Sequence, residues 1–198
     1  MKKVIGLLVA VLLLQSFAFS QDDDLVQGPT FGVHFFFNDF KSAKALKANS
    51  LGIVLKNHEF GKVKDMAPGL ALNYYQGISK YFDVSAMLGG SFLDYPMTGK
   101  ESFGKDFLLL EADISVRGKM FPNSYVVQPY VQAGMGVSKY KSYFGAVLPV
   151  GVGFQVNIFN EAFLLVNAQY RLPVTETTTA HFWWGIGLAG NIGKKKAE

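Results

Sequence analysis

Five charged side chains have types and spacings that could carry proton or ion chemistry. Glu111, Asp113 and Arg117 fall at odd-numbered positions of one segment, and Asp83 and Arg171 occur in two other segments. Two carboxylates beside a guanidinium could line a proton- or cation-selective passage. They could equally form a structural network, because a buried charge without a partner costs several kcal/mol. The need of each buried charge for a partner favours the salt-bridge network, and the passage is the alternative.

The histidines are the candidate metal ligands and catalytic bases. The chain has three of them, His34, His58 and His181, and their spacing matches no recognised zinc-ligand motif. None is followed within two residues by serine, so a hydrolase constellation of serine, histidine and acid has little support. We therefore expect no enzymatic activity, no metal and no cofactor, and we expect His34 and His181 to form hydrogen bonds inside the fold.

One glycine-rich segment, residues 185–190, matches the dinucleotide-binding fingerprint letter by letter. That fingerprint works only where a strand leads into the helix of a βαβ unit. The match lies too near the chain end for the helix and the second strand of such a unit to follow it. Glycines pointing into a crowded interior explain the segment better. The absence of cysteine also excludes disulfides, Cys-ligated zinc and a thiol nucleophile.

The first 20 residues have the features of a secretory signal peptide. Two lysines follow the initiator Met, residues 4–14 are almost unbroken apolar sequence, and Ala18 and Ser20 supply the small residues of a cleavage site. The apolar run is shorter than the roughly 20 residues that a membrane-spanning helix needs. We expect residues 1–20 to be removed, which leaves 17 basic against 15 acidic side chains. Such a balance gives no electrostatic footprint for nucleic acid.

The segments that contain these residues alternate between apolar and polar positions, and this two-residue period is typical of a β-strand. In residues 107–119 the even positions are apolar and most odd positions are polar, and residues 163–172 repeat the scheme. Weaker versions raise the number of expected strands to eight, which is enough to close a barrel. A short helix is expected near residues 50–58 in the first long connection, although Leu51, Ile53 and Leu55 also fit a strand. The eight expected strands lie in or around 31–38, 66–77, 84–92, 107–119, 131–137, 146–156, 163–172 and 182–192.

Alternation does not itself say which face of the barrel is apolar. A soluble lipid carrier would place its apolar side chains inside and its charges outside, but these strands have few charges on either face. Glycine, serine, asparagine and glutamine suit a crowded interior, whereas the apolar face suits hydrocarbon, where a closed sheet satisfies every backbone group. We therefore expect the lipid-facing residues to include Leu108, Leu110, Ala112, Ile114, Val116, Leu164, Val166, Phe182 and Trp184.

The chain resembles the small eight-stranded outer-membrane barrels of the OmpA/OmpX type, and in particular the barrels of OmpA-like proteins of the Bacteroidetes. The resemblance rests on the strand pattern and on stretches such as 31–35, 68–71 and 185–190. It implies insertion into a Gram-negative outer membrane by the barrel-assembly machinery. Relatives of this type continue into a peptidoglycan-binding domain, which is not expected here because only a short basic tail, 194–198, follows the last strand.

These observations predict an all-β protein: an eight-stranded antiparallel up-and-down transmembrane barrel over residues 21–193, with short periplasmic turns and longer outer loops. The expected role is structural or surface-interacting, with outer-membrane lipid as surroundings and the outer loops open to an extracellular ligand. The charges Asp83, Glu111, Asp113, Arg117 and Arg171 and the histidines His34 and His181 are expected in the lumen, with Asp83 opposite Arg117. The alternatives are a narrow ion-conducting channel and a secreted lipid-binding barrel.

Overall fold

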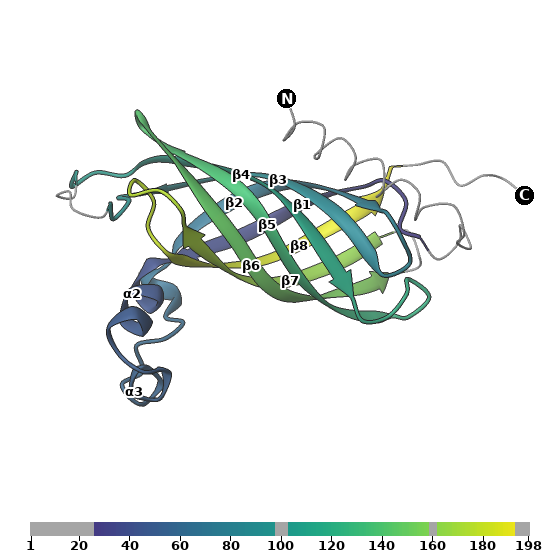
Figure 1. The fold of residues 1–198 in the computed structure, drawn as a ribbon, viewed down its shortest axis with the longest axis horizontal. Helices are drawn as coiled ribbons and strands as arrows, with labels where there is room; N and C mark the ends of the chain where they lie inside the picture. Colours follow the sequence, from purple (N-terminus) through teal and green to yellow (C-terminus); the bar gives the residue numbers. More distant parts are fainter. Residues whose placement is uncertain (1–25, 98–102, 159–161, 193–198) are drawn as a thin grey trace, which may run out of the picture.

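A computed structural model describes residues 26–97, 103–158 and 162–192. The expected signal peptide (1–20), the start of the mature chain and the basic tail (194–198) lie outside these residues. The described chain forms one closed antiparallel barrel in which each strand pairs with the next and β8 pairs with β1 (Figure 1). The strands are β1 (Thr30–Asp39), β2 (Ala67–Gly77), β3 (Phe82–Leu93), β4 (Phe107–Lys119), β5 (Val127–Tyr140), β6 (Tyr143–Ile158), β7 (Ala162–Pro173) and β8 (His181–Asn191). The predicted eight-stranded barrel is confirmed.

The two ends of the barrel differ in the length of their connections. At one end, which we call the long-loop end, the connections are 40–66, 94–106 and 174–180, together with the tight turn between β5 and β6. At the other, which we call the short-turn end, the connections are 78–81, 120–126 and 159–161. Figure 1 shows the two helices of the first connection projecting sideways from the long-loop end.

The first long connection contains two helices rather than the single short one that the sequence predicts. The predicted helix is α3 (Leu51–Lys56), and an unexpected helix α2 (Phe40–Ala48) directly follows β1. Asp39 caps α2 because its side chain accepts a hydrogen bond of 2.8 Å from the backbone N–H of Ser42. A 3-10 turn, η2 (Val63–Asp65), leads into β2. Within the described residues, no helix has the length and apolar character needed to cross a bilayer.

Side chains alternate between the inside and the outside of the barrel wall along every strand. In β4, Leu109, Glu111 and Asp113 are buried, whereas Leu110 and Ile114 are exposed. The other positions expected on the outside also point outward: Leu108, Ala112, Val116, Leu164, Val166, Phe182 and Trp184. The outer wall is therefore almost entirely apolar.

Candidate functional site: the barrel lumen

Polar and charged side chains from all eight strands fill the lumen. The fully buried set includes large groups such as Arg117, Arg171 and Trp183, each at most 1% exposed. Apolar clusters lie among the polar groups, and one of them consists of Phe36, Ala71, Met87 and Trp183. Buried charge in a protein interior is tolerated only where partners compensate its desolvation. The contacts of each charged group therefore decide what the lumen can do.

Arg171 lies at the centre of an ion cluster near the long-loop end. Its Nη1 is 3.1 Å from Glu111 Oε1, and its Nη2 is 3.0 Å from Asp113 Oδ2. His181 Nε2 lies 3.4 Å from the same Glu111 oxygen, and its Nδ1 lies 2.9 Å from the carbonyl of Thr179. The guanidinium reaches across the lumen from β7 to β4, so it links two strands that do not pair with one another. This cluster bridges the barrel interior.

Arg117 lies nearer the short-turn end and has neutral partners. Its guanidinium is 3.9 Å from the ring centre of Tyr130 and 4.7 Å from that of Tyr75, and its Nη2 donates a 3.1 Å hydrogen bond to Gln155. No described carboxylate forms a salt bridge with it. Aromatic faces attract a cation through their quadrupole, most strongly where water is excluded. Two rings and an amide therefore hold this charge.

Asp83 pairs with Lys119 instead of the predicted partner. The register places Asp83 opposite Arg117, as the sequence predicts, but the side chain of Lys119 lies 2.9 Å from Asp83 Oδ1. Lys119 also donates a 2.9 Å hydrogen bond to Asn123. The predicted position of Asp83 opposite Arg117 is therefore confirmed, but the two side chains form no ion pair: Arg117 lies over the rings of Tyr75 and Tyr130, and the ammonium of Lys119, two residues further along the same face of β4, reaches Asp83.

The two lumen histidines are buried but lie far apart. His34 pairs in register with Gly187, six residues along β8 from His181, which corresponds to about 20 Å of strand. His34 Nε2 lies 3.3 Å from the hydroxyl of Tyr75, and a Cβ at Gly187 would overlap the His34 ring. The glycine-rich segment thus makes room for a lumen side chain. Among the described residues, no three His, Asp, Glu or Cys side chains gather to hold a metal.

Aromatic rings close the lumen at the long-loop end. Phe40 packs against Tyr95 and His181, with ring centres 5.2 and 4.5 Å apart, and Tyr95 packs against Tyr140 at 5.3 Å. The Tyr140 hydroxyl donates to the carbonyl of Leu93 and accepts from the N–H of Tyr95. Burial raises the pKa of Tyr95 to about 12, so this residue remains a neutral phenol. We call Phe40, Tyr95, Tyr140 and His181 the mouth cluster.

Sequence reasoning missed several groups that determine the behaviour of the lumen. Lys119, Gln155, Tyr75 and Tyr130 all point inward with the parity of their strands, and each contacts a lumen charge. Lys119 continues the odd-numbered series of β4, so the alternation itself could have found it. No comparable local signal identifies which group lies across the lumen.

The comparisons with known proteins agree with this geometry. No family model matches the sequence, and no curated protein matches it. Among solved structures, Neisserial surface protein A is 12% identical with a TM-score of 0.57, covering 84% of this chain and 99% of that one. The N-terminal β-barrel domain of Pseudomonas aeruginosa OprF is 8% identical with a TM-score of 0.53, covering 81% and 96%. The outer membrane protein OprG of Pseudomonas aeruginosa is 11% identical with a TM-score of 0.52, covering 85% and 98%.

At this level of identity the likeness concerns the fold, and it covers most of both chains in each case. The closed eight-strand topology, the inward charges and the apolar wall fit the same architecture. The chain has the fold of the small eight-stranded outer-membrane β-barrels.

Proposed function

We propose that this protein is an integral barrel of the Gram-negative outer membrane, exported by an N-terminal signal peptide, with a non-enzymatic structural or surface-interaction role. In this proposal the barrel-assembly machinery inserts the chain, the long-loop end faces the outside of the cell, and the short-turn end faces the periplasm. The outer loops are the parts available to an extracellular ligand.

One observation carries the proposal: the polarity of the barrel is inverted relative to a water-soluble one. Large apolar side chains cover the outside, for example Leu70 at 63%, Leu88 at 55% and Met135 at 71% exposed, while charges lie within. Aromatic residues flank this band toward both ends, among them Phe37, Phe92 and Trp184 at the long-loop end and Tyr74, Phe82 and Phe154 at the other. Such an arrangement is stable in a bilayer and would aggregate in water.

The packing of the lumen supports a structural role over transport. An eight-stranded barrel is just wide enough for side chains to fill it, and here Arg117, Arg171 and Trp183 extend into the interior below the mouth cluster. A solute would have to displace these ion pairs and rings. We therefore expect no conductance for the folded protein.

Fractionation followed by electrophoresis tests the proposal. The protein is expressed with its signal sequence in a Gram-negative host, and outer-membrane extracts are run in detergent with and without boiling. We expect an outer-membrane band whose mobility changes on heating, because a closed barrel resists detergent until heated. A periplasmic protein without this change would instead favour the secreted lipid-binding barrel.

The ladder of buried charges favours one other candidate, a narrow ion channel. Glu111, Asp113 and Arg171 at one level and Asp83 and Lys119 at another place ionised groups along the interior. Planar-bilayer recording distinguishes the two functions. Discrete single-channel steps that change with Glu111→Gln or Arg117→Gln would establish the channel, whereas a silent wild-type barrel would support the packed lumen.

A further inference from the structure

The connection between β1 and β2, residues 40–66, which we call the basic loop, has a charge balance unlike that of the remaining chain. It contains six lysines against Glu59 and Asp65, although the whole chain has 19 basic and 15 acidic side chains. Lys41 is held by Asp65 at 2.7 Å, whereas Lys44, Lys47 and Lys64 form no salt bridge within the described residues. The loop therefore carries an excess of positive charge.

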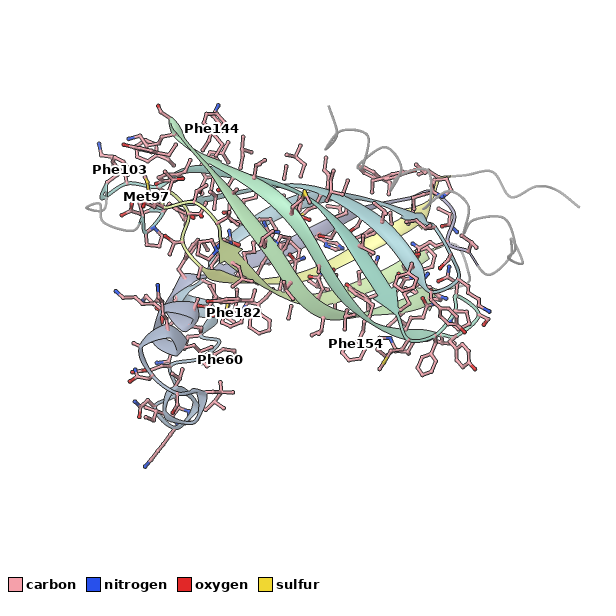
Figure 2. The ribbon with its side chains drawn as sticks, viewed as in Figure 1. Phe60, Met97, Phe103, Phe144, Phe154 and Phe182 are labelled. Atoms are coloured by element: carbon pink, nitrogen blue, oxygen red, sulfur yellow. The ribbon has the colours of Figure 1, made fainter. Side chains whose placement is uncertain are left out.

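Phe40, at the start of the basic loop, belongs to the mouth cluster, whereas the later part of the loop lies against the outer wall of the barrel. Phe60 contacts the outward rings of Phe182 and Trp184, with ring centres 5.5 and 6.0 Å apart. Figure 2 shows Phe60 between the loop and the barrel, close to Phe182. Because Phe182 and Trp184 belong to the apolar wall, this contact holds the loop where that wall ends. For a barrel in a membrane, this level is the boundary between acyl chains and headgroups.

Beyond Phe60, the basic loop leaves large apolar side chains uncovered. Leu51, Ile53, Leu55 and Val63 are 53%, 49%, 51% and 62% exposed. Exposed apolar residues next to lysines are typical of segments that lie in a membrane interface, where apolar groups enter the acyl boundary and cations meet headgroups. Water alone would leave this surface unfavourably hydrated.

A cavity of about 900 Å³ lies between α2 and the long-loop end of β2 and β3. Its lining combines apolar side chains such as Phe92 and Met97 with charged ones, in which four lysines outnumber three aspartates: Lys41, Lys44, Lys47 and Lys64 against Asp65, Asp94 and Asp106. A cavity with apolar side chains and an excess of lysine suits an amphiphile whose anionic group contacts the ammonium groups. The cavity thus combines lysines with apolar side chains, as the rest of the basic loop does.

We propose that the basic loop is a binding site for a phosphate-bearing lipid of the outer leaflet. Lys44, Lys47 and Lys64 contact the phosphate, and the apolar residues of the loop and cavity contact the acyl chains. Lysine suits this role because its ammonium binds phosphate as a compact point charge. The site rests on the proposed membrane function, since it requires the long-loop end to lie at a lipid surface.

The test compares lipids of equal acyl chains but different headgroup charge. The full-length barrel, refolded in neutral detergent and verified by its heat-dependent mobility, is titrated with phosphatidic acid or phosphatidylcholine, and bound lipid is counted by native mass spectrometry. Each lysine near an anionic surface contributes a factor of about five to binding. We therefore expect the Lys44→Gln/Lys47→Gln/Lys64→Gln variant to lose roughly 100-fold in affinity for phosphatidic acid and little for phosphatidylcholine.

A matched triple variant supplies the control. Lys80→Gln/Lys105→Gln/Lys139→Gln removes the same charge from outside the basic loop, and because none of these three lysines lines the cavity, its affinity should stay within about threefold of wild type. Equal losses in the two triple variants would overturn the proposal, because net charge rather than this site would then govern binding. So would an absence of preference between the lipids in a barrel that shows the mobility change.

Two further measurements separate the components of the site. Phe60→Ser should weaken phosphatidic acid binding, because the loop loses its contact with the wall, while leaving the mobility change intact. Inorganic phosphate should fail to compete at concentrations where phosphatidic acid saturates, and effective competition would overturn the lipid as occupant. A protein that shows no mobility change and no membrane insertion would refute the proposed function instead.

Discussion

Two buried arginines in the same lumen have opposite surroundings. Arg171 contacts the carboxylates of Glu111 and Asp113, whereas Arg117 lies between the rings of Tyr75 and Tyr130. Both side chains are at most 1% exposed, so both have given up their hydration. One is compensated by opposite charge and the other by polarisable rings and an amide.

The difference shows that the pairing of strands does not determine which side chains contact each other in a narrow barrel. Arg171 on β7 and its two acids on β4 are separated by two strands around the wall, and Arg117 on β4 reaches Gln155 on β6. Long side chains meet across the lumen because it is only as wide as the side chains themselves. The ion cluster therefore braces the wall, and its removal should affect stability more than removal of the ring-held arginine.

The largest expected effect comes from Arg171→Met, which leaves Glu111 and Asp113 buried together without a cation. Breaking a buried ion pair by removing one partner costs about 3–5 kcal/mol. Arg117→Met leaves no carboxylate unpaired and should cost at most about 2 kcal/mol, the upper range of a desolvated cation–π contact. Urea unfolding in lipid vesicles, followed by the mobility shift, measures both. Equal losses would show that the partners of the two arginines are energetically equivalent.

A charged side chain introduced on the outer face of the barrel tests whether that apolar face contacts lipid. Ile114 is 60% exposed at the middle of β4, and Ile114→Arg should cost about 2–4 kcal/mol near the bilayer centre. Val63 is equally exposed, at 62%, but belongs to the basic loop, so Val63→Arg should cost no more than about 1 kcal/mol at the interface. The same unfolding assay applies. Similar small losses at both positions would contradict a lipid-facing wall.

A double-mutant cycle distinguishes the observed partner of Asp83 from the one that the register suggests. Asp83→Asn and Lys119→Met should show a coupling of about 1–3 kcal/mol, because their groups share a hydrogen-bonded ion pair. The cycle with Arg117→Met should give a clearly smaller coupling, since Arg117 and Asp83 form no salt bridge. A larger coupling for the arginine would restore the pairing predicted from the register.

The same contrast explains how much the sequence could predict. The bounds of β4, the outward face and the inward position of the charges follow from alternation, which depends only on neighbouring residues. The partners of Arg117 and Asp83 do not, because they depend on side-chain reach across the closed barrel. Helix α2 was also missed, although Asp39 as cap and the Ala- and Lys-rich sequence after it are local signals. The expected strand 31–38 ends just before this cap, so the helix could have been predicted from the sequence.

The smallest effect concerns the exposed ion pair of the basic loop, which contrasts with the buried pairs of the lumen. The hydrogen bond from Lys41 lowers the pKa of Asp65 below its usual value. A depressed carboxyl pKa means that the pair stabilises the folded loop at and above the usual pKa of about 4, and that this contribution is lost as pH falls through the lowered value. In an NMR titration, the Asp65 carboxyl should have its midpoint at a lower pH in the wild-type protein than in the Lys41→Gln variant. An unchanged midpoint would show that water screens the pair completely, leaving Phe60 as the contact that holds the loop against the wall.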